Sequence, residues 1–248
     1  MIDNSSIDYS IIIPAYNEEK LLNQTLSAVL EAKNSLSERF SGEVIVVDNN
    51  STDNTAEIAR EFGVNVVFEK VNCIARARNA GAKNAKGKYL VFIDADTVVT
   101  PELLKHAILN LDSGKICAGG AYIGFEDGDV DFVAILLAWI WNHIIIRLYP
   151  VAAGSFLYCL KRGWEETGGF DESFYASEEI HFSKALKKWG RRNHLYFKII
   201  PLYVKSSSRK FKTYSKFEIF IKIIPLIIFP FLLKRKKLCS FWYERVNN

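Results

Sequence analysis

Residues 89–97 read Tyr-Leu-Val-Phe-Ile-Asp-Ala-Asp-Thr, an apolar run that ends in two aspartates one residue apart. The run predicts a strand covered on both faces of a parallel sheet, and such sheets bind ligands beyond the carboxyl ends of their strands. Two buried carboxylates require a cation or hydrogen-bond donors. Because oxygen ligands favour Mg²⁺ or Mn²⁺, Asp94 and Asp96 form a candidate metal site. The alternative is a turn in which they cap a helix starting near Pro101.

Strands and helices alternate through the first part of the chain. Apolar runs predict strands at 9–13, 44–47 and 64–68, and apolar residues at helical spacing predict helices at 18–35 and 75–85. This alternation predicts an α/β fold of Rossmann-like type, with a mostly parallel central sheet and flanking helices.

Composition excludes several classes of protein. The 248 residues carry a net charge of only +4, with acidic and basic residues mixed, which does not suggest a nucleic-acid partner. The four cysteines show no paired spacing, so neither a zinc site nor a disulfide framework is indicated. The polar N-terminus has no signal-peptide pattern, and we expect a cytoplasmic protein.

Two apolar segments, 132–149 and 217–233, suggest contact with a membrane surface. The second is followed by the basic run 234–237, which suits an anionic lipid surface, but its uncharged part is far shorter than the roughly 20 residues of a spanning helix. We therefore expect one catalytic domain, 1–216, and a C-terminal amphipathic or apolar helical appendage, 217–248. The alternatives are a core helix for the first segment and a partner-subunit surface, such as a homodimer interface, for either.

The loops after the predicted parallel strands should meet at one edge of the sheet. They offer the stretch Pro14 to Glu18, then Asp48, and then Asp94 with Asp96. A carboxylate such as Asp48 can accept hydrogen bonds from a ribose hydroxyl or a base N–H. No glycine-rich dinucleotide or Walker A pattern is present, which argues against NAD or a P-loop nucleotide.

The chain resembles the inverting family 2 glycosyltransferases of the GT-A fold. The resemblance covers Tyr9 to about Phe211. The motifs that carry it are Ser-Ile-Ile-Ile-Pro-Ala-Tyr-Asn-Glu-Glu at 10–19, Val-Ile-Val-Val-Asp-Asn-Asn-Ser-Thr-Asp-Asn-Thr at 44–55, Ala-Arg-Asn-Ala-Gly at 77–81, Lys-Gly-Lys-Tyr-Leu-Val-Phe-Ile-Asp-Ala-Asp at 86–96, Gly-Gly-Phe-Asp-Glu at 168–172 and Ser-Glu-Glu at 177–179.

The resemblance implies a nucleoside diphosphate sugar as donor and a divalent cation, Mg²⁺ or Mn²⁺, on the diphosphate. Asp94 and Asp96 match the family's Asp-x-Asp metal motif, in which the last carboxylate is the chief ligand. The residues expected to contact the nucleotide sugar are Pro14, Ala15, Tyr16, Glu18, Asp48, Arg78, Asp94, Ala95, Asp96, Gly154, Glu178 and Arg209.

The resemblance also implies a catalytic base. The family's base lies in a Glu-Asp pair, and here the pair is Glu178-Glu179, so Glu179 stands in place of the usual aspartate. Its role is to take the proton from the acceptor hydroxyl as that oxygen attacks. The alternative is a pair of acidic residues that only stabilise a helix N-terminus.

These features together predict a metal-dependent hexosyltransferase-type enzyme, attached peripherally to the cytoplasmic face of a membrane. Its acceptor is a hydroxyl or phosphate, lipid-linked or part of a cell-envelope polysaccharide. A non-catalytic nucleotide-sugar-binding regulatory subunit is the main alternative, because the base position departs from the family pattern. A nucleotidyltransferase is a third class, but no glycine-rich basic signature lies near the N-terminus.

Overall fold

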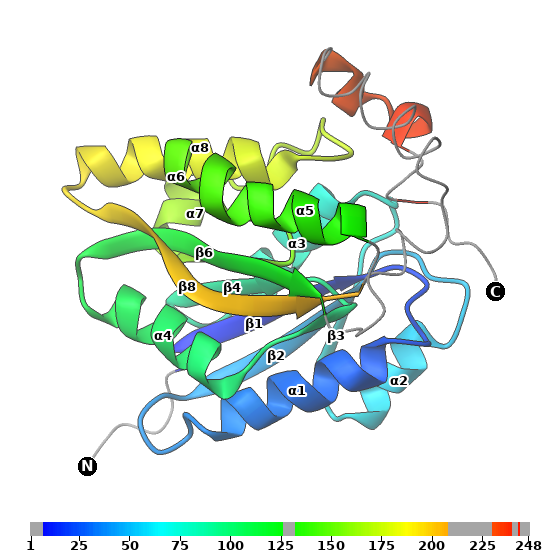
Figure 1. Ribbon diagram of the computed structural model, residues 1–248. Coiled ribbons are helices and arrows are strands. Elements are labelled where there is room, and N and C mark those ends of the chain that lie inside the picture. The colour runs from blue at the N-terminus through cyan, green and yellow to red at the C-terminus, as the bar shows by residue number, and fades with distance from the viewer. Residues whose placement is uncertain (1–6, 126–131, 208–229, 240–242, 244–248) are drawn as a thin grey trace.

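The computed structural model describes residues 7–125, 132–207, 230–239 and 243. Most of the chain forms one curled sheet with helices on both faces (Figure 1). The strands lie in the order β3 (Asn65–Phe68), β2 (Gly42–Asp48), β1 (Tyr9–Ala15), β4 (Tyr89–Ile93), β7 (Phe156–Leu160), β6 (Ile116–Phe125), β8 (Tyr196–Ser206) and β5 (Thr97–Val98).

The first half of the chain builds the parallel part of this sheet. Its strands are β1 (Tyr9–Ala15), β2 (Gly42–Asp48), β3 (Asn65–Phe68) and β4 (Tyr89–Ile93). They are joined by α1 (Leu22–Asn34), α2 (Thr55–Glu61) and α3 (Ile74–Asn84). β1 pairs in parallel with both β2 and β4, and β2 with β3, so the predicted parallel units are confirmed here.

The second half makes the sheet mixed. Its elements are β5 (Thr97–Val98), α4 (Pro101–Asp112), β6 (Ile116–Phe125), α5 (Phe132–Ile140), the π-helix η1 (Trp141–Ile145), α6 (Ile146–Leu148), β7 (Phe156–Leu160), α7 (Lys161–Thr167), α8 (Glu178–Arg192) and β8 (Tyr196–Ser206). β7 runs antiparallel to β4 and β6, whereas β6 and β8 are parallel. Two short 3-10 helices, η2 (Pro230–Lys234) and η3 (Lys236–Cys239), follow.

The core has two layers, because the central strands bury both faces. β1 and β4 are buried along their whole length. Alternate residues of β1 point to opposite sides: Ile11 and Ile13 pack with α1 and α4, and Ile12 packs with the layer containing α3 and α8. Figure 1 shows α1, α2 and α4 below the sheet and α3, α7 and α8 above it. This double burial explains the uninterrupted apolar runs in the sequence.

The apolar segment 132–149 forms α5, η1 and α6, and it is not an ordinary core helix. Leu136 is 43% exposed and Trp139 is 51% exposed. Asn142 fixes η1 to β6: its Nδ2 donates to Ile123 O at 2.7 Å, and its Oδ1 accepts from Ile123 N at 2.9 Å. None of the described helices is long and apolar enough to cross a bilayer. Residues 217–229 of the predicted appendage lie outside the described residues.

Candidate active site

The expected convergence of strand ends is observed. Ala15 at the end of β1 is paired in register with Asp48 at the end of β2, and β4 lies on the other side of β1. The loops that follow these three strands therefore open on one edge of the sheet. A small pocket and a larger cavity lie at this edge, and Asp94, Asp96 and Ile74 line both.

The smaller pocket, of about 90 Å³, gathers the residues that follow β1. Its lining consists of Pro14, Ala15, Tyr16, Glu18, Asn49, Ile74, Asp94, Ala95, Asp96 and Tyr243. The Glu18 side chain is buried, and its backbone N–H donates to Thr55 Oγ1 at 2.8 Å, which fixes the loop after β1 against α2. Four of the residues predicted from the first motif thus share one pocket with the aspartate pair.

The larger cavity, of about 380 Å³, has one polar and one apolar wall. The polar wall contains Arg78, Asp94, Asp96, Glu178 and Glu179. The apolar wall contains Ile123, Phe125, Leu137, Ala138 and Trp141, from β6, α5 and η1. Charged side chains therefore line one part of this cavity and apolar side chains line another.

Arg78 is the buried cation that links the acidic residues of the polar wall. Its Nη2 donates to Asp94 Oδ1 at 2.8 Å and to Gly154 O at 3.0 Å, and its Nη1 donates to Glu178 Oε1. Burial alone would lower the pKa of Arg78, but the carboxylates of Asp94, Glu178 and Glu179 raise it above its ordinary value. The guanidinium remains charged and fixes Asp94 relative to the start of α8.

Glu178 and Glu179 begin α8 in an unusual local conformation. Ser177, the residue before them, has a φ of 60°, which is rare for a residue other than glycine and is typical of functional sites. Burial, followed by repulsion from Glu178, raises the pKa of Glu179 to about 8. Burial also raises the pKa of Glu178, despite its pairing with Arg78. A carboxyl with a pKa near neutrality is suited to general acid–base chemistry.

Gly154 leaves space between the aspartate and the glutamate. A Cβ at this position would lie 3.6 Å from Asp94 Oδ2 and 3.8 Å from the Glu179 carboxyl carbon. The same Cβ would lie 3.0 Å from Arg78 Nη2, closer than ordinary van der Waals contact. Because Gly154 has no side chain, a bound molecule can enter the space between Asp94 and Glu179.

Asp94 and Asp96 lie at the junction of the smaller pocket and the larger cavity. Their carboxylate oxygens fit a divalent cation that is shared with a substrate. Among the described residues, no three His, Cys, Asp or Glu side chains are grouped so as to enclose a metal. Asp94 and Asp96 both line the pocket and the cavity, and one oxygen of Asp94 is engaged by Arg78. Mg²⁺ is commonly held by one or two carboxylates together with substrate phosphates. The carboxylates of Asp94 and Asp96 are ligands of the type that this arrangement requires.

Asp48 is a predicted site residue that lines neither the smaller pocket nor the larger cavity. Asp48 is buried, and its Oδ1 accepts from Ser51 N at 2.9 Å, so it shapes the loop after β2. The next residue, Asn49, lines the smaller pocket instead. Arg209 lies outside the described residues, two positions after Ser207, which lines the larger cavity.

Two side chains near the site have structural partners. Arg76, on α3 with Arg78, pairs with Glu69 and Glu172. Trp164 donates to Asn79 Oδ1 and lines neither space.

Sequence reasoning missed several lining residues. Ile74, Trp141, Tyr175 and Tyr243 contribute to the walls but belong to no motif that was singled out for chemistry. Tyr243 comes from the far end of the chain. For Trp141, the sequence signal was the apolar character of residues 132–149, which predicted a membrane-contacting segment but not a cavity wall.

A comparison with protein families decides the classification. The family model of glycosyl transferase family 2 matches residues 10–158, more than half of the chain. The chain belongs to glycosyl transferase family 2. The matched part contains the loops after β1 and β2, Arg78, the pair Asp94 and Asp96 after β4, and Gly154.

Named relatives match less than half of this chain. Poly(ribitol-phosphate) beta-N-acetylglucosaminyltransferase TarS of Staphylococcus aureus is 32% identical over 111 residues, 42% of this chain and 19% of TarS. Dolichyl-phosphate beta-glucosyltransferase of Drosophila melanogaster is 36% identical over 105 residues, 38% of this chain and 32% of the relative. Undecaprenyl-phosphate 4-deoxy-4-formamido-L-arabinose transferase of Shewanella sediminis is 30% identical over 127 residues, 48% of this chain and 38% of the relative. The matches thus span less than two fifths of each relative.

Solved structures share the fold over most of the chain. TarS of S. aureus in complex with UDP-GlcNAc has a TM-score of 0.60 and 21% identity, and covers 81% of this chain and 58% of that chain. Mannosyltransferase PcManGT from Pyrobaculum calidifontis, in complex with GDP-Man and Mn²⁺, has a TM-score of 0.62 and 20% identity, and covers 95% of this chain and 70% of that chain. These likenesses confirm the predicted GT-A fold class.

Proposed function

We propose that this protein is an inverting glycosyltransferase that moves a sugar from a UDP- or GDP-linked donor to an acceptor hydroxyl or phosphate. The observation that carries the proposal is the position of Asp94 and Asp96 on the wall shared by the small pocket and the larger cavity. In this arrangement the nucleoside occupies the small pocket and the diphosphate lies at the junction. The sugar and the acceptor then meet in the cavity that Glu179 lines.

Glu179 acts as the general base in this proposal. As the carboxylate, it accepts the proton of the acceptor oxygen while that oxygen attacks the anomeric carbon on the face opposite the nucleotide, which inverts the configuration. Gly154 supports this role, because its missing side chain leaves the space between Glu179 and Asp94 for the donor sugar. Arg78 is a positioning residue, since it holds Asp94 and Glu178 in place.

The proposal includes a divalent cation, Mg²⁺ or Mn²⁺, at the junction. When bound, such a cation stabilises the negative charge that develops on the leaving diphosphate. The carboxylates of Asp94 and Asp96 would hold it.

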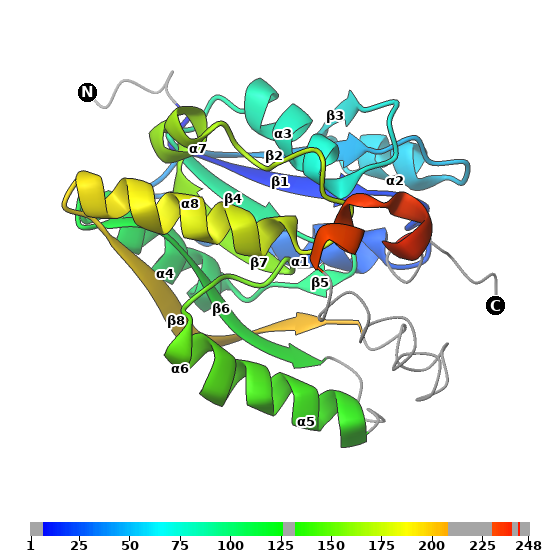
Figure 2. The same ribbon diagram turned by 90° about the horizontal axis from the view of Figure 1, so that it is seen from above.

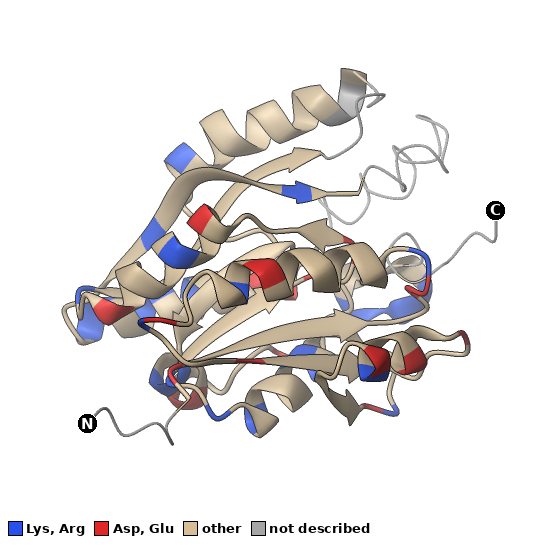
Figure 3. Cartoon of the chain, turned by 90° about the horizontal axis from the view of Figure 1, so that it is seen from below, with Lys and Arg blue, Asp and Glu red and all other residues tan. Residues whose placement is uncertain are grey.

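The acceptor in this proposal is linked to a lipid, and the enzyme works at the surface of a membrane, on its cytoplasmic side. Support comes from the α5–η1–α6 segment, where Phe132, Leu136, Trp139 and Tyr149 are all exposed. The segment has no acidic residue and one arginine, and Figure 3 shows no red on the coloured part of this helix, along the upper edge of that view. Such a surface suits an anionic lipid interface, in which tryptophan and tyrosine are enriched. Its inner side lines the cavity, so a lipid-anchored acceptor can reach Glu179 from the bilayer.

Product analysis tests the proposal. The wild-type chain is incubated in detergent with Mn²⁺, UDP- and GDP-linked sugars and a lipid-linked acceptor that carries a free hydroxyl. The nucleoside diphosphate and the glycosylated lipid are then measured by mass spectrometry. We expect both products, and we expect Glu179→Gln to lower turnover at least about 100-fold with an unchanged donor Kd. The matched control is Glu165→Gln, at an exposed glutamate of α7. Near-normal turnover of Glu179→Gln would reject the assigned base, and pyrophosphate as the product would indicate a nucleotidyltransferase.

A non-catalytic nucleotide-sugar-binding regulatory subunit is the second candidate. It is favoured by the glutamate at position 179, because its extra methylene group moves the carboxylate away from the place where the family's usual aspartate would hold it. A wild-type chain that binds the donor with Mn²⁺ but gives no product with any acceptor would support this candidate.

A further inference from the structure

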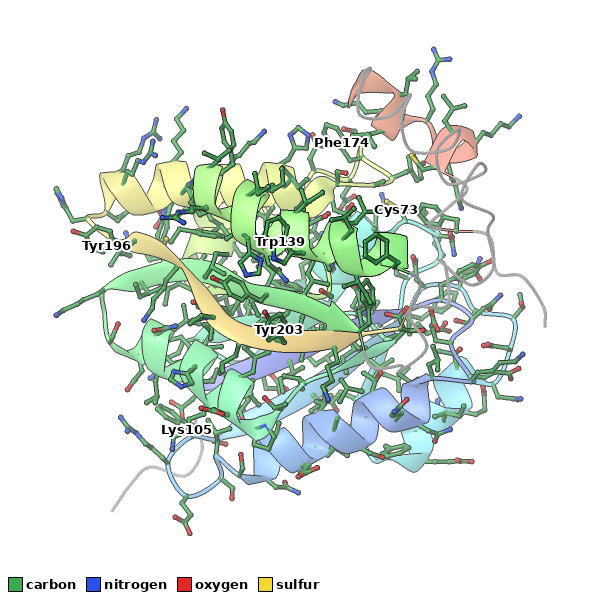
Figure 4. The ribbon with its side chains drawn as sticks, viewed as in Figure 1. Cys73, Lys105, Trp139, Phe174, Tyr196 and Tyr203 are labelled. Atoms are coloured by element: carbon green, nitrogen blue, oxygen red, sulfur yellow. The ribbon has the colours of Figure 1, made fainter. Side chains whose placement is uncertain are left out.

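The described C-terminal residues, 230–239 and 243, pack against the site; we call them the C-terminal strap. Leu233 and Cys239 are buried in a cluster with Phe174 and Ala176. Leu233 O accepts from Tyr175 N at 2.9 Å, and Lys234 Nζ lies 4.6 Å from the centroid of the Phe174 ring. Figure 2 shows the 3-10 helices of the strap, in red, beside the start of α8, and Figure 4 shows Phe174 next to them. The strap therefore packs on the loop that leads into Glu178 and Glu179.

Tyr243 connects the strap to α3. Its hydroxyl accepts from Ile74 N at 3.3 Å, and Ile74 is the first residue of α3, where backbone N–H groups have no partner within the helix. Its ring packs edge-to-face on Tyr175, with 6.0 Å between centroids, and Lys236 Nζ lies 5.1 Å from its centroid. Burial raises the pKa of Tyr243, so the hydroxyl stays protonated.

The same tyrosine lines the smaller pocket. Tyr16, from the loop after β1, and Tyr243 are both in its wall, together with the buried carboxylate of Glu18. Aromatic rings stack on the faces of nucleobases, and a carboxylate can accept the N–H groups of a base edge. The chemistry of this pocket is thus that of a nucleobase site to which both ends of the chain contribute.

We infer that Tyr243 contacts the nucleobase of the donor, so that the C-terminal strap completes the donor site. The inference relies on the proposed function for the identity of the ligand. It assigns a binding role to the end of the chain, which lies beyond the segment matched by the family. The strap also connects the smaller pocket to the loop that leads into Glu178. Tyr243 contacts Ile74 and Tyr175, and Leu233 packs with the residues before α8.

Nucleotide titrations of the full-length chain test the inference. The Kd for UDP and for GDP is measured with Mn²⁺ by calorimetry for the wild type, Tyr243→Ala and Tyr243→Phe. We expect Tyr243→Ala to raise the Kd of the preferred nucleotide at least about fivefold, the lower end of the effect of losing one stacked aromatic side chain. Tyr243→Phe keeps the ring and should stay within about twofold of the wild type. The matched control is Tyr196→Ala, a tyrosine that is 71% exposed at the opposite end of α8 from the strap (Figure 4).

A measurement on the wild type covers the case in which Tyr243→Ala does not fold. Hydrogen–deuterium exchange of the peptides spanning 230–248 is compared with and without the nucleotide and Mn²⁺, and we expect slower exchange in the complex. Unchanged exchange, or a Tyr243→Ala variant that folds and binds as tightly as the wild type, overturns the inference and leaves the proposed function intact. A wild-type chain that binds neither UDP nor GDP overturns both.

Discussion

Arg78 Nη2 lies 2.8 Å from Asp94 Oδ1, and the other terminal nitrogen of the same guanidinium donates to Glu178. One buried arginine thus joins Asp94 to the helix that carries the proposed base. The pairing positions Asp94, and Asp96, which lines both the pocket and the cavity, is the main ligand of the cation in the proposal. The positive charge of Arg78 also explains how four acidic side chains can lie together at a buried edge of the sheet, namely Asp94, Asp96, Glu178 and Glu179.

Replacing Arg78 should destabilise the fold strongly. Arg78→Gln leaves the carboxylates of Asp94 and Glu178 without their cation, and breaking a buried pair in this way costs about 3–5 kcal/mol. The measurement is the free energy of unfolding in urea. Arg76→Gln is the matched control, because Arg76 lies on the same helix and pairs with Glu69 and Glu172 at the surface. Equal losses for the two variants would refute the assigned role of Arg78.

The pKa of Glu179 predicts how stability changes with pH. The folded protein keeps the Glu179 proton up to a pKa of about 8, whereas the unfolded chain loses it near 4.5. Between about pH 5 and pH 8 the folded state therefore binds more protons, and the free energy of unfolding falls as the pH rises. Glu179→Gln cannot ionise, so its thermal unfolding temperature should fall less over this range. Parallel pH profiles for the wild type and the variant would contradict the raised pKa.

Gly154 should be sensitive to the smallest substitution. The Cβ of Gly154→Ala would lie 3.0 Å from Arg78 Nη2 and would occupy the space between Asp94 and Glu179. We expect at least a tenfold loss of kcat/KM, about 1.4 kcal/mol, with little change in stability. Gly124→Ala is the control, since its Cβ would meet Tyr203 at an ordinary 3.4 Å. If both variants retain full activity, the donor sugar does not pass Gly154.

The exposed apolar helix predicts membrane binding that depends on α5. Ile135, Leu136 and Trp139 are 52%, 43% and 51% exposed, respectively, and Figure 4 shows Trp139 on this helix. Replacing all three by serine should abolish sedimentation with anionic phosphatidylglycerol vesicles, because the buried apolar area and aromatic anchors are lost. Tyr196→Ser, at another exposed aromatic, should have no effect. Undiminished sedimentation of the triple variant would show that α5 is not the contact.

Local sequence patterns predicted much of the fold, because a strand and the polar residues that follow it are adjacent in the sequence. The apolar run of β4 predicted a buried strand, and the aspartates directly after it predicted both the end of that strand and a candidate site. The antiparallel strand β7 and the partners of Arg78 depend on contacts between distant segments, which one sequence does not encode as a pattern. The same reason explains why Trp141 and Tyr243 were missed: they reach the site only through packing. Arg209 stays a prediction.

The most direct test of the central claim is manganese-dependent binding of a nucleoside diphosphate at the Asp94–Asp96 edge. The Kd of UDP and of GDP is measured by calorimetry, with and without Mn²⁺, for the wild type and for Asp96→Asn. We expect Mn²⁺ to tighten the binding of one nucleotide to the wild type at least about tenfold. We expect Asp96→Asn to lose that gain, because the proposal makes Asp96 the main protein ligand of the cation. Binding that is tight without metal, or a gain from Mn²⁺ that survives in Asp96→Asn, would contradict the account.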